Sequence, residues 1–313
     1  MTTQMDRAER LAGNQGDPLK STVPATAIKD SRGVRTFRVF NVIILLTVCF
    51  LTLYPFANVV AQAFSAEAYI RTGQVNIIPR GFNVQTFTYV MSDSMFWINY
   101  RNTVVYTVVA TIIAMIMTTS FAYAISKQHI KGRNFLIGVA VFTMFFNGGL
   151  IPNYILISAL GMKNTIWAIV IPNAISVFNL LVMKSFFENF PTDLEEAATM
   201  DGLTTYGVFL RIVLPLSKAV IATMILFYSV SFWNSWFAAF LYMDRSDLYP
   251  VTIYLRNLLA GATAIDAQGT DAVQINANVQ AVTMLLTALP IIMVYPFIQK
   301  YFVSGVMLGS VKQ

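Results

Sequence analysis

The chain has 313 residues, of which 56% are hydrophobic and 12% are charged. Soluble domains carry about 25% charged residues, so this composition excludes a water-soluble globular protein and indicates a membrane protein. The net charge of +6 requires no nucleic-acid partner, and a single cysteine excludes an internal disulfide or a thiolate metal site.

Six apolar stretches follow a polar N-terminal segment. Residues 1–38 show little periodic apolar pattern, which predicts a mobile cytoplasmic tail, and residues 39–313 are predicted to form one membrane domain. Each stretch is long enough to cross a hydrocarbon core of about 30 Å. The six stretches are 40–64, 103–126, 135–160, 166–182, 219–243 and 279–298. The sequence therefore predicts an all-α integral membrane protein with six transmembrane helices.

The distribution of positive charge predicts the orientation. Fifteen of the 21 Lys and Arg residues lie in segments on the same side as the N-terminus, and six lie on the other side. Because cytoplasmic loops carry the excess of Lys and Arg, both termini are predicted to be cytoplasmic. The segment 183–218, between the fourth and fifth stretches, is then cytoplasmic as well.

The six stretches contain no Asp, Glu, Lys, Arg or His. Proton-driven carriers usually need an ionisable relay inside the membrane, so that mechanism is disfavoured, while a sodium-coupled carrier built on backbone carbonyls stays open. The chain also lacks the G-x-x-x-x-G-K-[ST] loop that cradles nucleotide phosphates. We expect a non-enzymatic transport subunit that binds no metal or cofactor and receives its energy from another protein.

Amide, hydroxyl and indole groups supply the polarity inside the stretches. The run from Ser231 to Phe237 sets two Trp beside Asn and Ser, which suits a neutral sugar with an apolar ring face and many hydroxyls. Helix–helix hydrogen bonding and interfacial anchoring of Trp are the competing interpretations. The candidate substrate-pathway residues are Asn147, Asn153, Asn179, Trp233, Asn234 and Trp236.

The segment 188–215 is acidic, and no Lys or Arg lies between residues 189 and 210. A helix on an anionic membrane surface normally carries Lys and Arg, so this one is predicted to bind a basic surface on another protein. Thr192 and Glu195 match a capping box, and Gly202 is placed to end the helix in a left-handed turn. A second short helix is expected to follow. The carboxylates are Glu188, Asp193, Glu195, Glu196 and Asp201.

The same segment carries a family signature. Glu196-Ala197-Ala198, Gly202, Ile212 and Leu214-Pro215 stand at the spacing of the EAA motif. From about residue 96 to its end, the chain resembles permeases of bacterial binding-protein-dependent ABC importers. The runs NGGLIPNYIL, WNSWFAAF and GVMLGSVKQ are similar to carbohydrate permeases of the maltose-transporter second-subunit type, and to permeases for complex oligosaccharides.

The resemblance implies a type I importer permease in the bacterial cytoplasmic membrane, with a cytoplasmic coupling helix in 188–215. It implies four kinds of partner: a second permease in a heterodimer, two ATPase subunits that use ATP and Mg²⁺, an extracytoplasmic binding protein, and an oligosaccharide. Glu196 would meet a basic group of the ATPase, with Ala197 and Ala198 against its cleft. The implied coupling residues are Glu195, Glu196, Ala197, Ala198, Asp201, Gly202, Ile212, Leu214 and Pro215.

Two alternatives stay open on the sequence. The same architecture could import another small solute, such as glycerol-phosphate or a peptide. A membrane scaffold that recruits a cytoplasmic partner through the acidic segment would belong to a different class of protein. The spacing of the EAA motif favours the importer over the scaffold and leaves the other cargoes open.

Overall fold

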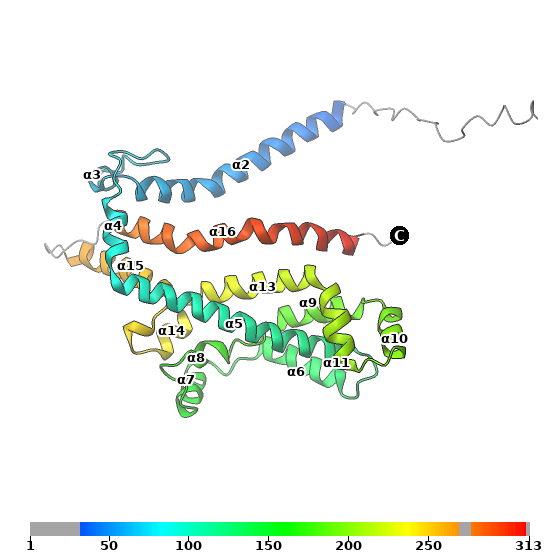
Figure 1. The fold of residues 1–313 in the computed structure, drawn as a ribbon. Helices are drawn as coiled ribbons and strands as arrows, with labels where there is room; N and C mark the ends of the chain where they lie inside the picture. The colour runs from blue at the N-terminus through cyan, green and yellow to red at the C-terminus, as the bar shows by residue number, and fades with distance from the viewer. Residues whose placement is uncertain (1–31, 269–276, 311–313) are drawn as a thin grey trace, which may run out of the picture. The chain divides into compact units, whose positions relative to one another are not determined.

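The computed structural model describes residues 32–268 and 277–310, and all regular elements within these two ranges are helices (Figure 1). The all-α prediction is therefore confirmed for the described residues. In chain order the helices are α2 (Arg32–Ala63), α3 (Glu67–Arg71), α4 (Gln85–Ser92), α5 (Ser94–Ser126), α6 (Arg133–Phe145), α7 (Leu150–Ala159), α8 (Trp167–Val170), α9 (Val177–Glu188), α10 (Thr192–Met200), α11 (Thr205–Val208), the π-helix η1 (Phe209–Val213), α12 (Leu214–Leu216), α13 (Lys218–Trp233), α14 (Phe237–Tyr242), the 3₁₀ helix η2 (Ser246–Leu248), α15 (Val251–Gln268) and α16 (Ala277–Ser310).

The chain divides into two compact units between Leu53 and Tyr54, inside α2. In the first unit, apolar side chains such as Phe40, Leu46 and Leu51 are exposed along α2. A helix that is apolar on every face is typical of a membrane span. Of the predicted N-terminal tail, residues 1–31 lie outside the described part of the chain, and residues 32–38 form the first turns of α2.

Three of the predicted spans are continuous helices. Gly33–Ala63, Ser94–Ser126 and Ala277–Val294 are long and apolar enough to cross a membrane. They correspond to the first, second and sixth predicted stretches. In α5, the second of them, the Asp93 carboxylate accepts a hydrogen bond of 2.9 Å from the Met95 N–H, which caps the N-terminus of the helix.

The other three stretches are interrupted, so the count of six transmembrane helices is confirmed only in part. In the third, α6 and α7 meet at 115°. The fourth is divided into α8 and α9 by residues 171–176, and the fifth into α13 and α14 by residues 234–236. Besides α6 and α7, one other pair is strongly bent, Thr205–Leu216 with Lys218–Trp233 at 83°. The three continuous helices and these two pairs give up to five spans among the described residues.

Glycine and proline explain two of the interruptions. Gly149 ends the α6–α7 connection at φ +90° and ψ 171°, a conformation that is essentially restricted to glycine. Pro172 has no N–H to donate, so it cannot continue the series of helical hydrogen bonds after Ile171. It therefore helps to end α8 before residues 173–176.

Within the second unit, α5 is the central helix, and it packs against α9 and α13. Its buried side includes Ala110, Ala114 and Ala122, which are almost fully inaccessible. Small residues let membrane helices approach closely, and Leu180 of α9 and Met224 of α13 complete this core.

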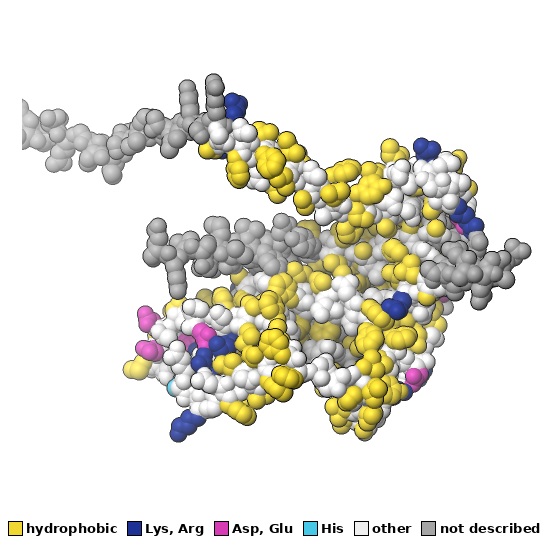
Figure 2. All heavy atoms as spheres, turned by 180° about the vertical axis from the view of Figure 1, so that it is seen from behind, with side chains coloured by type: hydrophobic (Ala, Val, Ile, Leu, Met, Phe, Trp, Pro, Cys, Tyr) yellow, Lys and Arg dark blue, Asp and Glu magenta, His cyan; other side chains and the backbone are white. Residues whose placement is uncertain are grey.

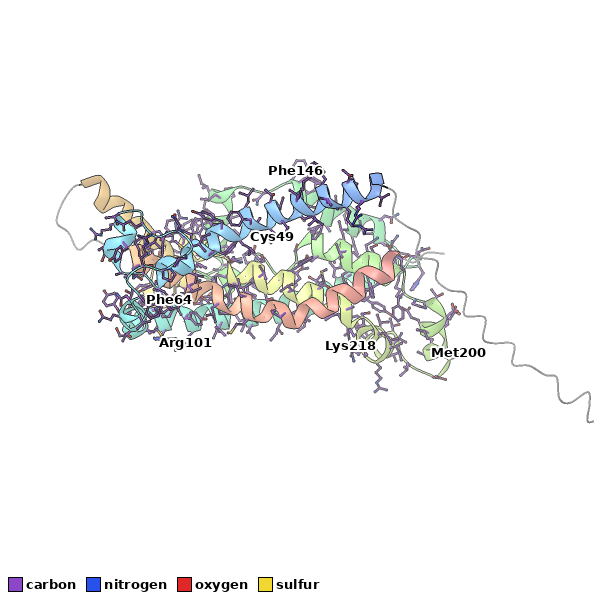
Figure 3. The ribbon with its side chains drawn as sticks, turned by 90° about the horizontal axis from the view of Figure 1, so that it is seen from above. Cys49, Phe64, Arg101, Phe146, Met200 and Lys218 are labelled. Atoms are coloured by element: carbon purple, nitrogen blue, oxygen red, sulfur yellow. The ribbon has the colours of Figure 1, made fainter. Side chains whose placement is uncertain are left out.

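Charged groups of the second unit lie mainly toward the two ends of the face in Figure 2, with apolar side chains between them. Figure 3 shows Phe64 and Arg101 toward one end of this unit, and Met200 and Lys218 toward the other. The polar ends and the apolar middle are typical of a protein that crosses a membrane.

We expect Gly149→Ala to destabilise the α6–α7 bend, because a side chain at this φ and ψ costs about 1–3 kcal/mol. A lower thermal unfolding temperature of the detergent-solubilised protein would measure this cost. Gly148→Ala is the matched control, since a Cβ there would meet no neighbouring atom closer than 3.8 Å. Equal unfolding temperatures for the two variants would contradict the requirement for glycine at position 149.

Candidate functional site

The acidic segment forms two short helices joined by a tight turn. The N–H groups of Gly202 and Leu203 donate to the carbonyls of Thr199 and Ala198, at 3.0 and 3.1 Å. This is the Schellman pattern, and Gly202 has the positive φ of +85° that the pattern requires. The predicted glycine turn is therefore confirmed, and the predicted second helix is formed by α11, η1 and α12.

The predicted capping box is wrong. Pro191 occupies the cap position of α10, without any side-chain cap bond, and Thr192 is already helical. The Glu195 carboxylate pairs with the Lys127 ammonium group at 2.5 Å instead of turning back to the helix start. An ion pair with a charged donor is stronger than a bond to a neutral N–H, which explains this choice.

The carboxylates of the segment fall into two groups. Glu195 pairs with Lys127, and Glu188 pairs with Arg133 and with Lys184, the latter at 2.8 Å. The expectation that the whole acidic segment waits for a basic partner is therefore too broad. The exposed carboxylates, for which the described residues provide no ion pair, are Asp193, Glu196 and Asp201.

The signature residues also divide by exposure. Glu196 and Ala197 are exposed, but Ala198 is only 4% exposed and packs in the core with Val208 and Phe209. The expectation that Ala198 lies on a docking surface is not met in this structure, because the turn at Gly202 points it inward. Ile212 and Leu214 are half-buried against the same core, and Pro215 is exposed.

Two apolar side chains on this surface were missed by the sequence analysis. Met200 is 88% exposed and Tyr206 is 81% exposed, next to the turn at Gly202. Exposed aromatic residues and Met are enriched where proteins bind each other. Their signal in the sequence was an apolar residue on either side of an otherwise polar turn.

A cavity of about 1130 Å³ lies between the interruption 171–176, the first turn of α9 and α13. Its volume exceeds the range of about 300–1,000 Å³ for small-molecule pockets. Aromatic rings of Phe178 and Phe232 line it together with polar side chains, and none of its described lining residues is charged. The polar lining residues are Asn173, Ser176, Asn179, Tyr228, Ser231 and Ser235.

The Tyr228 hydroxyl holds the interrupted backbone in place. It accepts a hydrogen bond of 2.9 Å from the Ser176 N–H and lies 2.6 Å from the hydroxyl of Thr118 on α5. The Asn173 side-chain amide donates to the Ile169 carbonyl at 3.0 Å. The interruption lies in the fourth predicted span, and non-helical backbone in such a span is tolerated where protein satisfies it or where it lines a cavity. Both conditions hold here.

Only one predicted pathway residue lines this cavity, namely Asn179, which is 5% exposed. Trp233 is 7% exposed, and its Nε1–H donates to the Thr287 carbonyl at 3.1 Å, so it packs α13 against α16. The Asn234 amide donates to the Val230 carbonyl at 2.9 Å and closes the end of α13.

The remaining three predicted residues lie elsewhere. The Asn153 amide donates to the Asn147 side-chain oxygen at 3.1 Å, at the bend between α6 and α7. Trp236 stacks under the Arg256 guanidinium at 3.7 Å. The structure therefore does not bring the six predicted residues into one site. Ser176 was missed because the sequence analysis treated 166–182 as one continuous helix.

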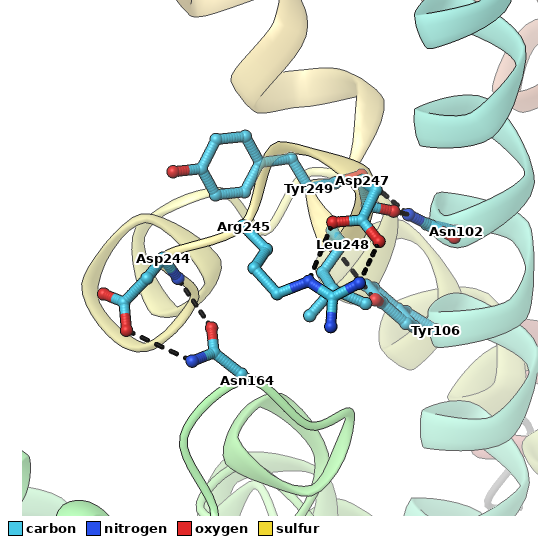
Figure 4. A network of polar contacts seen from close by, with 8 residues as sticks. All are labelled: Asn102, Tyr106, Asn164, Asp244, Arg245, Asp247, Leu248 and Tyr249. Atoms are coloured by element: carbon cyan, nitrogen blue, oxygen red, sulfur yellow. Dashed lines mark hydrogen bonds and ion pairs between the residues drawn. The ribbon is translucent and has the colours of Figure 1, made fainter.

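The opposite end of the second unit is held by a polar network around residues 244–249 (Figure 4). Asn102 of α5 donates to the Asp247 carbonyl at 2.7 Å, and the Tyr106 hydroxyl donates to the Leu248 carbonyl at 2.9 Å. Hydrogen bonds from Asn164 and Lys163 hold the pKa of the Asp244 carboxyl below its ordinary value. The loop before α15 is thus fixed to α5.

Tyr228→Phe should lower the thermal unfolding temperature, because it leaves the half-buried Ser176 N–H without its partner, at a cost of about 1 kcal/mol. Tyr242→Phe is the matched control. Tyr242 is 7% exposed, close to the 2% of Tyr228, and its hydroxyl has no hydrogen bond among the described residues. An unfolding temperature equal to that of the control would contradict the role of the Tyr228 hydroxyl.

Known proteins are similar to nearly the whole chain, although no profile of a known protein family matches it. Protein LplC of Bacillus subtilis is 39% identical over 286 residues, which are 90% of this chain and 97% of LplC. The polygalacturonan/rhamnogalacturonan transport system permease protein YtcP of Bacillus subtilis is 34% identical over 282 residues, 88% of this chain and 99% of YtcP.

The fold is also found in solved structures. A chain of a bacterial ABC transporter involved in the import of the acidic polysaccharide alginate superposes with a TM-score of 0.79 and 30% identity, covering 87% of this chain and 99% of that one. A chain of an alginate ABC transporter in complex with a periplasmic protein has a TM-score of 0.54 at 16% identity, with 84% and 93% covered, which shows the shared fold alone. The chain therefore belongs to the permease family of ABC importers, whose members are transport subunits and not enzymes.

Proposed function

We propose that this permease forms half of the transmembrane pathway for an oligosaccharide, and that the cavity beside Tyr228 is part of that pathway. The cavity carries the proposal, because it combines amide and hydroxyl groups with aromatic rings, and no charged side chain is among its described lining residues. Such a surface can hydrogen-bond sugar hydroxyls and contact the apolar face of a sugar ring. The names of the relatives YtcP and the alginate transporter support a saccharide cargo.

The proposed assembly contains the partners that the EAA motif implies. An extracytoplasmic binding protein would deliver the oligosaccharide, and a second permease subunit would complete the pathway as a heterodimer. Residues Val104, Val108, Ile112 and Ile116 form an exposed apolar stripe on α5, which is available to that subunit or to lipid. In this proposal the chain makes six crossings in the bacterial cytoplasmic membrane, with both termini in the cytoplasm.

Energy would come from two ATPase subunits that hydrolyse ATP with Mg²⁺, while this chain binds no cofactor. The proposed contact is the exposed surface of the acidic segment 188–215, which we call the coupling segment. This surface includes Glu196, Met200 and Tyr206. Its free carboxylates suit a basic cleft, and its exposed apolar side chains suit a protein surface.

Among other solutes, glycerol-phosphate is disfavoured because the described part of the cavity lining contains no Lys or Arg, and phosphate recognition normally uses such groups. A peptide has no such argument against it and is the alternative cargo. The scaffold hypothesis has no observation in its favour, since membership of the permease family already accounts for the membrane helices and the acidic segment.

Asn179→Leu should raise the KM for uptake about fivefold, the equivalent of one lost hydrogen bond of about 1 kcal/mol. Uptake of labelled oligogalacturonides and alginate oligosaccharides by cells that carry the complete transporter measures this change. Asn234→Ala is the control, because Asn234 is exposed and does not line the cavity. A larger effect at Asn234 than at Asn179 would favour the Trp233–Trp236 run as the sugar site and contradict the proposed cavity.

Glu196→Lys should abolish transport and weaken co-purification of the ATPase subunits, since a reversed charge at a desolvated contact costs about 2–5 kcal/mol. The variant should still insert in the membrane, because Glu196 is exposed and supports no internal contact. The control is Glu67→Lys, an equal change of charge at a distant helix, α3, where it breaks only the local pair with Arg71. Normal transport by Glu196→Lys would exclude the segment as the docking element.

A further inference from the structure

Cations of the loop between α5 and α6 meet the acidic coupling segment. The Lys127 ammonium group lies 2.5 Å from both carboxylate oxygens of Glu195 and 4.5 Å from the centre of the Tyr123 ring. The Lys127 and Glu195 side chains are only 19% and 17% exposed. A pair at this depth is less screened by salt than a surface pair.

A second ion pair joins the same two parts of the chain. The Arg133 guanidinium pairs with Glu188, at the start of the coupling segment, and its Nε–H donates to the Ile125 carbonyl in the last turn of α5 at 2.7 Å. The coupling segment is therefore attached at two points, Glu188 and Glu195, to the end of α5.

The other side of α5 reaches the cavity. Thr118 lies on α5 between the ion pairs and the middle of the helix, and its hydroxyl is 2.6 Å from Tyr228 in the cavity wall. Tyr228 in turn accepts the N–H of Ser176, at the interruption between α8 and α9. A continuous set of ion pair, rigid helix and buried hydrogen bonds thus connects the coupling segment with the cavity.

We propose that Lys127 and Glu195 are positioning residues, which make α5 follow the coupling segment when a partner subunit moves it. Glu195 is then not a docking residue, although it stands beside the docking residue Glu196. This inference rests on the proposed function, since it needs a partner that moves α10. It goes beyond that function because it assigns Glu195 to a contact within the permease and not to the contact with the ATPase.

The test uses the complete transporter in lipid nanodiscs, with its binding protein and ATPase subunits. The probe is whichever of oligogalacturonides or alginate oligosaccharides stimulates ATP hydrolysis by the unaltered transporter. The readout is the ratio of stimulated to unstimulated hydrolysis, together with co-purification of the ATPase subunits. We expect Glu195→Gln and Lys127→Met each to reduce this ratio about tenfold, within the usual range of coupling between sites.

Two further variants separate transmission from folding. Lys127→Arg keeps the charge and should retain most of the stimulation. The exchanged pair Lys127→Glu with Glu195→Lys restores the attraction and should recover the ratio that either single charge reversal loses. If the single variants failed only because the protein unfolds elsewhere, the exchanged pair would not recover the ratio of stimulated to unstimulated hydrolysis.

Three results would overturn the inference. Normal stimulation in both single variants would show that the ion pair transmits nothing. Absence of recovery in the exchanged pair would show that the two residues do not act together. Loss of the ATPase subunits from Glu195→Gln during purification would make Glu195 a docking residue. The proposed function is tested separately, because its docking assignment depends on Glu196→Lys.

Discussion

A helix that is broken inside a membrane leaves backbone N–H and C=O groups that lipid cannot satisfy. Here the break between α8 and α9 depends on the Tyr228 hydroxyl, which binds the Ser176 N–H and the hydroxyl of Thr118. That arrangement opens polar backbone and side chains toward a cavity of about 1130 Å³. The cavity, its neutral lining and its connection to α5 all follow from this one satisfied interruption.

Ion pairs and hydrogen bonds also attach other parts of the second unit to the two ends of α5. At one end of α5, Lys127 holds the coupling segment through Glu195. At the other end, Asn102 and Tyr106 hold the loop before α15. Because α5 has contacts at both of its ends and is buried along one side, it is suited to join events at the two ends of the second unit.

Local rules predicted the parts of the structure that depend on nearby residues. The glycine turn at Gly202 and the three continuous spans belong to this group. Contacts distant in sequence could not be predicted: Lys127 is 68 residues from Glu195, and its attraction prevailed over the local capping box. For the same reason Trp233, which looked like a sugar site within its own run, packs against Thr287. The hydropathy pattern did not reveal the interruptions of the helices either, because interrupted and continuous spans have the same apolar composition.

The central claim is that the cavity beside Tyr228 conducts the cargo, and the single cysteine of the chain, Cys49, makes it directly testable. In a Cys49→Ser background, Ser231→Cys places a thiol in the cavity lining, whereas Ser229→Cys lies two residues away on α13 and outside it. The account predicts that a water-soluble thiol reagent labels Cys at position 231, and that oligosaccharide delivered during turnover slows this labelling but not labelling at position 229. Labelling at position 231 that is absent, or that transported sugar leaves unchanged, would contradict it.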